Sequence, residues 1–247
     1  MGNIVTNIRG IFPGIFTVGN LFCGFLAILS AFDGQVINSC RFILLGFFLD
    51  GLDGFVARVS NSVSRFGMEL DSLADLLTFG VAPAVLLYNA QLEALGNWGW
   101  MVAFVFVMCG AFRLARFNLS ARTSPRGTFE GLPIPAAASL LVSYTMFCLD
   151  VWGEFQLDRV LVVMMIVTSG LMVSSIPYEK RPTSWRNNWD RIKFLFIVGA
   201  IIGAVIDLSK TLFPFVLIYV LSGIVREGVH LYQSGRRYAR NIRSNNR

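Results

Sequence analysis

Long apolar runs alternate with short polar segments along the chain. No charged residue occurs in 10–32, 94–112, 131–149 or 160–178. A helix needs about 20 residues to cross a hydrocarbon core about 30 Å thick, so each run is long enough to span a bilayer. The pattern predicts an all-α, polytopic membrane bundle of eight transmembrane helices, at residues 11–32, 39–59, 66–90, 95–117, 132–150, 158–177, 192–208 and 211–232.

The two ends of the chain differ from these runs. Residues 1–12 place five apolar side chains on one helical face, which predicts a short interfacial helix before the first span. Residues 233–247 form a basic tail that we expect to lie in the cytoplasm and to contact anionic lipid head groups. No connection is long enough to separate two domains, so 1–247 is expected to be one domain.

Composition and charge agree with a membrane protein. Hydrophobic residues make up 55% of the chain and charged residues 15%, whereas a soluble domain carries about 25% charged residues. All 21 lysines and arginines except Arg41, Arg159 and Lys210 fall on the side of the predicted membrane that holds both termini. The positive-inside rule therefore predicts an inner-membrane protein with both termini in the cytoplasm. Because the basic residues are juxtamembrane, we expect no nucleic-acid partner.

Four carboxylates lie where a membrane protein rarely tolerates them. Asp50 and Asp53 are near the cytoplasmic end of the second span, and Asp71 and Asp75 are in the first turns of the third. Each costs roughly 2.5–3.5 kcal/mol deep in a span. Their i, i+3 and i, i+4 spacing puts each pair on one helical face, and the short connection makes the two helices antiparallel neighbours. The pattern thus predicts opposed acidic faces.

Opposed carboxylates repel each other unless cations lie among them. Oxygen ligands favour hard divalent ions, so we expect two Mg²⁺ or Mn²⁺ ions, with Ca²⁺ as a further and non-productive occupant. No histidine or cysteine lies nearby to favour zinc. The small residues Gly54, Ala57 and Gly67 leave a gap for a phosphate or nucleotide, and Arg58 can pair with an anion there. This combination favours phosphoryl-type transfer.

The segment DGLDGFVARVSNSVSRFGMELDSLAD, which begins at Asp50, matches D-x2-D-G-x2-A-R-x8-G-x3-D-x3-D at every fixed position. In this it resembles the CDP-alcohol phosphotransferases. The resemblance implies a homodimer in which four aspartates surround a two-metal site and one of them, Asp75, is the general base. It further implies that four residues contact the CDP moiety. The metal ligands would be Asp50, Asp53, Asp71 and Asp75, and the CDP contacts Gly54, Ala57, Arg58 and Gly67.

Three further segments narrow the acceptor. FRLARFN (112–118), GLPIP (131–135) and SSIPYEK (174–180) resemble the bacterial phosphatidylserine synthase branch. That resemblance implies transfer of phosphatidyl from CDP-diacylglycerol to L-serine with release of CMP. Arg113 and Arg116 are candidates for holding the serine carboxylate or the lipid phosphate, although both can instead reach lipid head groups. Asn20, a polar residue within the first span, either faces the CDP moiety or makes a hydrogen bond between helices.

Two alternatives remain open at this point. The same chemistry with glycerol 3-phosphate or an inositol phosphate would need more cations in the acceptor pocket. An acidic-lined cation transporter would also carry intramembrane carboxylates. The transporter leaves the Gly–Ala–Arg spacing after Asp53 unexplained.

Overall fold

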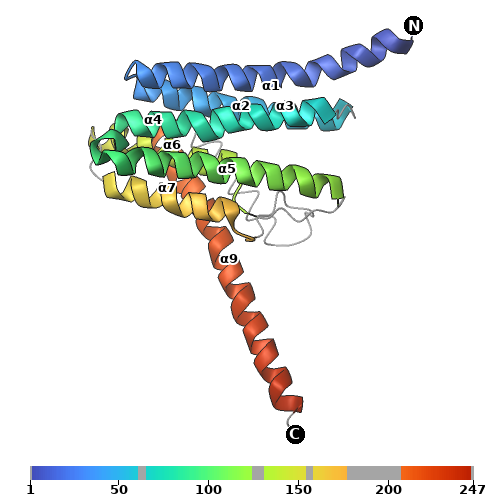
Figure 1. The fold of residues 1–247 in the computed structure, drawn as a ribbon, viewed down its shortest axis with the longest axis vertical. Helices are drawn as coiled ribbons and strands as arrows, with labels where there is room; N and C mark the ends of the chain where they lie inside the picture. Colours follow the sequence, from blue (N-terminus) through green and yellow to red (C-terminus); the bar gives the residue numbers. More distant parts are fainter. Residues whose placement is uncertain (1, 61–64, 124–130, 154–157, 177–206, 246–247) are drawn as a thin grey trace.

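A computed structural model describes residues 2–60, 65–123, 131–153, 158–176 and 207–245, with side chains for most of these. Every regular element in these ranges is a helix (Figure 1). In chain order the elements are α1 (Gly2–Phe32), α2 (Val36–Ser60), α3 (Arg65–Asp75), the π-helix η1 (Leu76–Val81), α4 (Ala82–Ala90), the 3-10 helix η2 (Leu92–Leu95), α5 (Asn97–Thr123), α6 (Ile134–Trp152), α7 (Asp158–Val173) and α9 (Leu208–Asn245).

Helices occupy seven of the eight predicted spans, and the span at 192–208 lies almost entirely outside the described residues. Within the described residues, five helical segments are long and apolar enough to cross a membrane: Gly14–Phe32, Phe66–Ala90, Asn97–Leu119, Ile134–Trp152 and Leu208–Gly228. The apolar part of α7 is shorter, at Arg159–Val173. The protein is therefore an integral membrane helical bundle, but the count of eight spans is not confirmed.

The N-terminal helix differs from the prediction. Residues 2–12 do not form a separate helix, because α1 runs without a break from Gly2 to Phe32. Its first turns bend away from the bundle (Figure 1). Location of this segment at a membrane surface stays a prediction. The basic tail is likewise helical, since α9 continues to Asn245 and extends away from the other helices.

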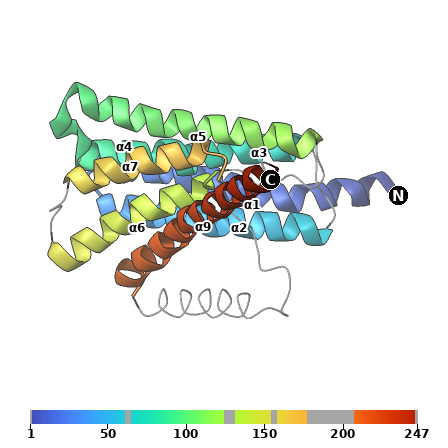
Figure 2. The same ribbon diagram turned by 90° about the horizontal axis from the view of Figure 1, so that it is seen from below.

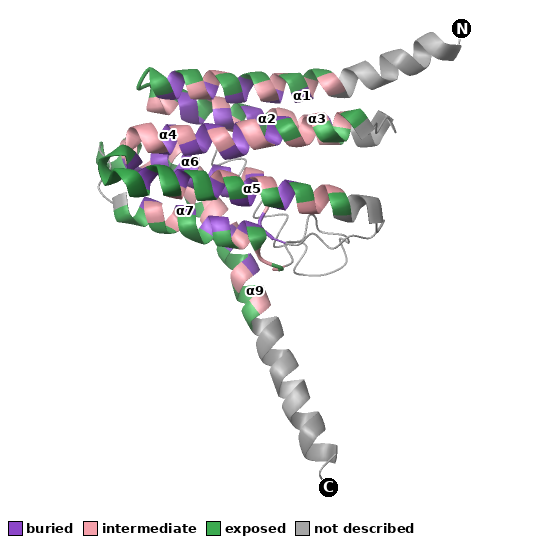
Figure 3. Ribbon diagram, viewed as in Figure 1, coloured by how far each residue is buried: buried purple, intermediate pink, exposed green. Residues whose placement is uncertain are grey.

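The helices lie side by side in layers. The α1 helix packs against α2 and against the continuous rod formed by α3, η1 and α4, while α5 packs on α7 and α6 on α9 (Figure 2). Large apolar side chains such as Phe22, Phe48 and Phe104 are more than half exposed on the outer faces, and buried residues line the inner faces (Figure 3). Such a surface fits lipid rather than water.

The third predicted span contains a π-helical turn directly after Asp75. The turn, Leu76–Val81, precedes Pro83, which lies in the first turn of α4. Because proline cannot donate a hydrogen bond and its ring collides with the preceding turn, the wider turn accommodates it. The turn also buries Thr78 and Phe79 in the centre of the bundle.

Candidate metal centre

Three of the four predicted aspartates converge. Asp50 on α2 and Asp71 and Asp75 on α3 each offer a carboxylate oxygen, and these oxygens lie within 4.8 Å of one another. Asp50 and Asp71 are half-buried, whereas Asp75 is 8% exposed. The i, i+4 spacing places both carboxylates of α3 on one helical face, and there they meet the carboxylate of Asp50 from α2.

This donor set fits a hard divalent cation. Oxygen ligands bind Mg²⁺ at about 2.1 Å and Ca²⁺ at about 2.3–2.6 Å, so two oxygens on opposite sides of one ion are about 4.2 Å apart for Mg²⁺ and about 4.6–5.2 Å apart for Ca²⁺. The three oxygens lie within 4.8 Å of one another. Small side-chain adjustments would therefore let the three carboxylates share an ion.

Asp53 lies outside this trio. It is one turn beyond Asp50 on α2 and is 7% exposed. Its Oδ2 accepts a hydrogen bond from the Thr17 hydroxyl on α1. Its Oδ1 is buried and has no hydrogen-bond partner among the described residues. The structure therefore holds the fourth carboxylate beside the cluster, through a residue that the sequence did not single out.

Asn20 contacts the cluster from the same helix as Thr17. Its side chain is completely buried, and its Nδ2 donates a 3.1 Å hydrogen bond to Asp75 Oδ1. Of the two possibilities that the sequence left open, the structure displays the hydrogen bond between helices. Any contact of Asn20 with the CDP moiety stays a prediction.

The other predicted CDP contacts are described only in part. Gly54 on α2 and Gly67 on α3 are half-buried, so neither is covered completely by neighbouring helices. Ala57 and Arg58 belong to α2, but their side chains lie outside the described residues. The predicted gap beside the carboxylates stays a prediction.

Arg113 and Arg116 lie one turn apart on α5 but have different surroundings. Arg113 is 8% exposed, lies over the Phe117 ring and interacts electrostatically with Asp75 and Asp50. Arg116 donates hydrogen bonds to two carbonyl oxygens at the end of α7, those of Val173 at 3.0 Å and Ser174 at 2.9 Å. Arg113 thus lies within electrostatic range of the acidic cluster, whereas Arg116 caps a helix.

The three segments that suggested the acceptor meet at this helix end. Arg116 comes from the first segment and Gly131 from the second, while Ser174 begins the third. The amide of Gly131 donates to the Ile176 carbonyl at 2.9 Å. Gly131 has a φ of 82°, and a Cβ there would lie 2.3 Å from the Met172 carbonyl oxygen, so the turn requires glycine. Part of the resemblance therefore reflects packing beside the site.

These features define an integral membrane helical bundle in which two helices bring together three carboxylates that could hold a divalent cation. Residues 10–176 match the CDP-alcohol phosphatidyltransferase family. The chain belongs to that family.

Curated relatives agree with this assignment. The chain is 36% identical over 219 residues to the CDP-diacylglycerol–serine O-phosphatidyltransferase of Helicobacter pylori, covering 87% of this chain and 90% of the relative. It is 37% identical over 210 residues to the protein of the same name from Methanocaldococcus jannaschii, with 85% and 90% covered. The archaetidylserine synthase of Methanothermobacter thermautotrophicus is 36% identical over 170 residues, with 68% and 69% covered.

Proposed function

We propose that the protein is a CDP-diacylglycerol–serine O-phosphatidyltransferase, which transfers phosphatidyl from CDP-diacylglycerol to the hydroxyl of L-serine and releases CMP. The convergence of Asp50, Asp71 and Asp75 within an unbroken family motif is the observation that carries the chemistry. The relatives named above support serine as the acceptor, because all three carry the name of a serine-using synthase.

The four aspartates hold two divalent cations, Mg²⁺ or Mn²⁺, in this proposal. When bound, such ions neutralise diphosphate charge and draw electron density from the attacked phosphorus. Gly54, Ala57 and Gly67 leave room for the CDP moiety, and Arg58 pairs with its phosphates. Calcium fits the same oxygen ligands but, as a larger ion with flexible geometry, is expected to occupy the site without supporting turnover.

Asp75 acts as the general base. Its carboxylate takes the proton of the serine hydroxyl as the serine oxygen forms a bond to the phosphorus that bears diacylglycerol. The bond from that phosphorus to the bridging oxygen breaks, and the electron pair leaves with CMP. The hydrogen bond from Asn20 to Oδ1 of Asp75 fixes the orientation of this carboxylate.

Arg113 is the better candidate of the two arginines for holding the serine carboxylate or the lipid phosphate. Its buried guanidinium lies within electrostatic range of Asp75, so an anion bound there would lie near the base. Arg116 already donates to two backbone carbonyls of α7. If Arg116 contributes, it does so through its remaining donors.

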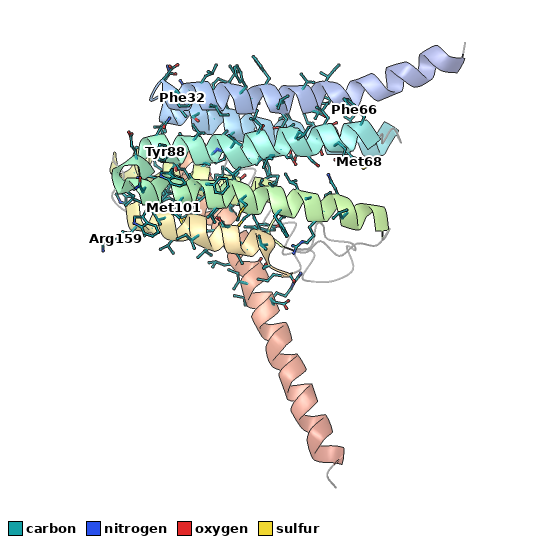
Figure 4. The ribbon with its side chains drawn as sticks, viewed as in Figure 1. Phe32, Phe66, Met68, Tyr88, Met101 and Arg159 are labelled. Carbon is teal, nitrogen blue, oxygen red and sulfur yellow. The ribbon has the colours of Figure 1, made fainter. Side chains whose placement is uncertain are left out.

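The active site faces the cytoplasm in this proposal, and both termini lie there, in the inner membrane. Arg159 lies at the end of the bundle that also holds Phe32, opposite the end marked by Phe66 (Figure 4). The scarcity of basic residues at that end supports its placement outside the cytoplasm. The family resemblance also leads us to expect a homodimer. Chemical crosslinking in native membranes tests this expectation.

An acceptor panel tests the proposed function. Purified protein is given CDP-diacylglycerol, Mn²⁺ or Mg²⁺, and in separate reactions L-serine, glycerol 3-phosphate or an inositol phosphate. We expect CMP release with serine and none above background with the two phosphates. Release of CMP with glycerol 3-phosphate or an inositol phosphate instead would support the same reaction with a different acceptor. Metal-dependent ion flux in vesicles without CMP release would favour the transporter.

A further inference from the structure

The α1 helix reaches both acidic helices with two polar side chains one turn apart. Thr17 donates to Asp53 Oδ2 on α2, and Asn20 donates to Asp75 Oδ1 on α3. Residues 10–32 of α1 carry no charge, and polar side chains in such a membrane segment are stabilised by hydrogen bonds inside the bundle. The α1 helix thus contributes one donor to a carboxylate on each side of the predicted metal site.

Both hydrogen bonds are shielded from solvent. Thr17 is 4% exposed and Asn20 is 0% exposed, while their acceptors Asp53 and Asp75 are 7% and 8% exposed. Hydrogen bonds to a carboxylate are stronger than neutral ones, and losing a partner inside a protein leaves an oxygen that nothing compensates. Each bond therefore fixes the orientation of its carboxylate.

Each donor also selects which oxygen stays available. Thr17 occupies Oδ2 of Asp53, and the other oxygen, Oδ1, is buried without a hydrogen-bond partner among the described residues. Asn20 occupies Oδ1 of Asp75 in the same way. A carboxylate held by one oxygen presents the second in a defined direction, which is what a cation ligand needs.

The position of α1 is itself fixed close to the site. The Thr78 hydroxyl, within the π-helical turn, donates to the Asn20 carbonyl at 2.9 Å. A Cβ on Gly24 would lie 2.9 Å from Thr78 Cα, and one on Gly46 would lie 2.9 Å from Asn20 Oδ1. Three helices approach this closely only because glycine stands at both positions.

We propose that Thr17 and Asn20 are positioning residues of the metal centre, which orient Asp53 and Asp75 from a third helix. This inference rests on the proposed function in one respect, namely that the carboxylates bind divalent cations. Loss of a hydrogen-bond partner behind a metal ligand typically weakens metal affinity by about 10–100-fold.

Mn²⁺ binding to the purified full chain without substrate tests the proposal, measured by electron paramagnetic resonance of the free ion. Thr17→Val keeps the shape and removes the hydroxyl, and we expect about tenfold weaker binding. Thr17→Ser restores the donor and should bind like the wild type. Thr168→Val is the matched control, because Thr168 is a buried threonine on α7 whose hydroxyl, among the described residues, bonds only within its own helix, to the carbonyls of Met164 and Met165.

A purely structural role predicts a different result. Thr17→Val would then lower the melting temperature as Thr168→Val does and leave Mn²⁺ affinity within twofold of the wild type, which would overturn the proposal. A double-mutant cycle sharpens this test. In the Asp53→Asn background, Thr17→Val should change affinity by less than twofold, whereas a full tenfold loss there would show that Thr17 does not act through Asp53.

Asn20→Leu provides an independent arm if Thr17→Val does not fold. It should weaken Mn²⁺ binding in the wild type but not in the Asp75→Asn background, and an equal loss in both backgrounds would count against the inference. CMP release by the wild type distinguishes a failure of the proposed function from a failure of the positioning roles. A wild type that binds Mn²⁺ and responds to Thr17→Val, yet releases no CMP with serine, contradicts the proposed function and leaves the positioning roles intact.

Discussion

Two groups of aspartates lie at different places in the bundle and are stabilised differently. At the start of α9, Lys210 Nζ lies 3.2 Å from Asp150 Oδ2 and 3.1 Å from Asp207 Oδ2, with all three side chains at least 35% exposed. Near the opposite end, three aspartates bring oxygens within 4.8 Å of one another, and one of them is buried. The first group pairs opposite charges, whereas the second concentrates like charges.

The difference teaches how to separate structural from functional acids in one chain. Opposite charges at a helix end need nothing further, and exposed pairs of this kind contribute little to stability. Like charges that converge out of water are costly unless something positive joins them. A cluster that a fold maintains despite that cost is a candidate site, and the experiments below compare the two groups directly.

Removing charge from the base should have the largest effect. Asp75→Asn cannot accept the serine proton, and we expect CMP release to fall by about 10²–10⁴-fold. Asp71→Asn should cause a similar loss through the metals. Asp150→Asn, in the group around Lys210, should keep wild-type turnover. Equal turnover in Asp75→Asn and Asp150→Asn would remove the functional distinction between the groups.

Divalent cations should stabilise the protein through only one of the groups. At a concentration of about 100 times the dissociation constant, a bound ion adds about 2.7 kcal/mol, or roughly 5–10 °C in melting temperature for a chain of this size. We expect Mn²⁺ to raise the melting temperature of the wild type and of Asp150→Asn, but not of Asp71→Asn. The measurement is a thermal scan in detergent with and without EDTA.

The two arginines of α5 sharpen the comparison further. Arg113 lies within electrostatic range of the acidic cluster and is proposed to hold the serine carboxylate. A lysine at this position cannot bind that carboxylate through two parallel hydrogen bonds, so Arg113→Lys should raise the KM for serine about tenfold. Arg116→Lys should instead lower the melting temperature, because the carbonyls of Val173 and Ser174 lose a fixed partner. A raised serine KM in Arg116→Lys alone would reverse these assignments.

The sequence predicted what depends on periodicity. Apolar runs located the described helices, and i, i+4 spacing put Asp71 and Asp75 on one face. Contacts between helices distant in sequence were not predictable in this way. Thr17 lies in an apolar run, and nothing in local spacing says that it meets Asp53, 36 positions away. Arg116 and Arg113 have the same sequence environment, and only packing against α7 separates their roles.

The continuous N-terminal helix and the π-helical turn escaped prediction for a related reason. A face of apolar residues at 1–12 indicates a helix but not where it ends. Pro83 accounts for a widened turn before it, but a proline can also kink or end a helix, so its presence alone does not specify a π-helical turn. Both features depend on details that the spacing of apolar residues does not encode.

The smallest expected effect concerns the group around Lys210. The Lys210 ammonium and the amides of Lys210 and Ser209 donate to Asp207, and these bonds lower the pKa of its carboxyl from the ordinary value of 3.8. A lowered folded pKa means that the charged form contributes stability above the ordinary pKa and that the contribution disappears as pH falls through the folded pKa.

Asp207→Asn isolates that charge, because asparagine still accepts the amide hydrogen bonds that cap α9. We expect its melting temperature to be about 1 °C below that of the wild type at pH 7, since exposed pairs are weak, and the difference to shrink as the pH falls below the ordinary pKa of 3.8. Turnover at pH 7 should not change. A difference that stays constant from pH 7 to pH 3 would mean that the asparagine disturbs the cap rather than the ion pair.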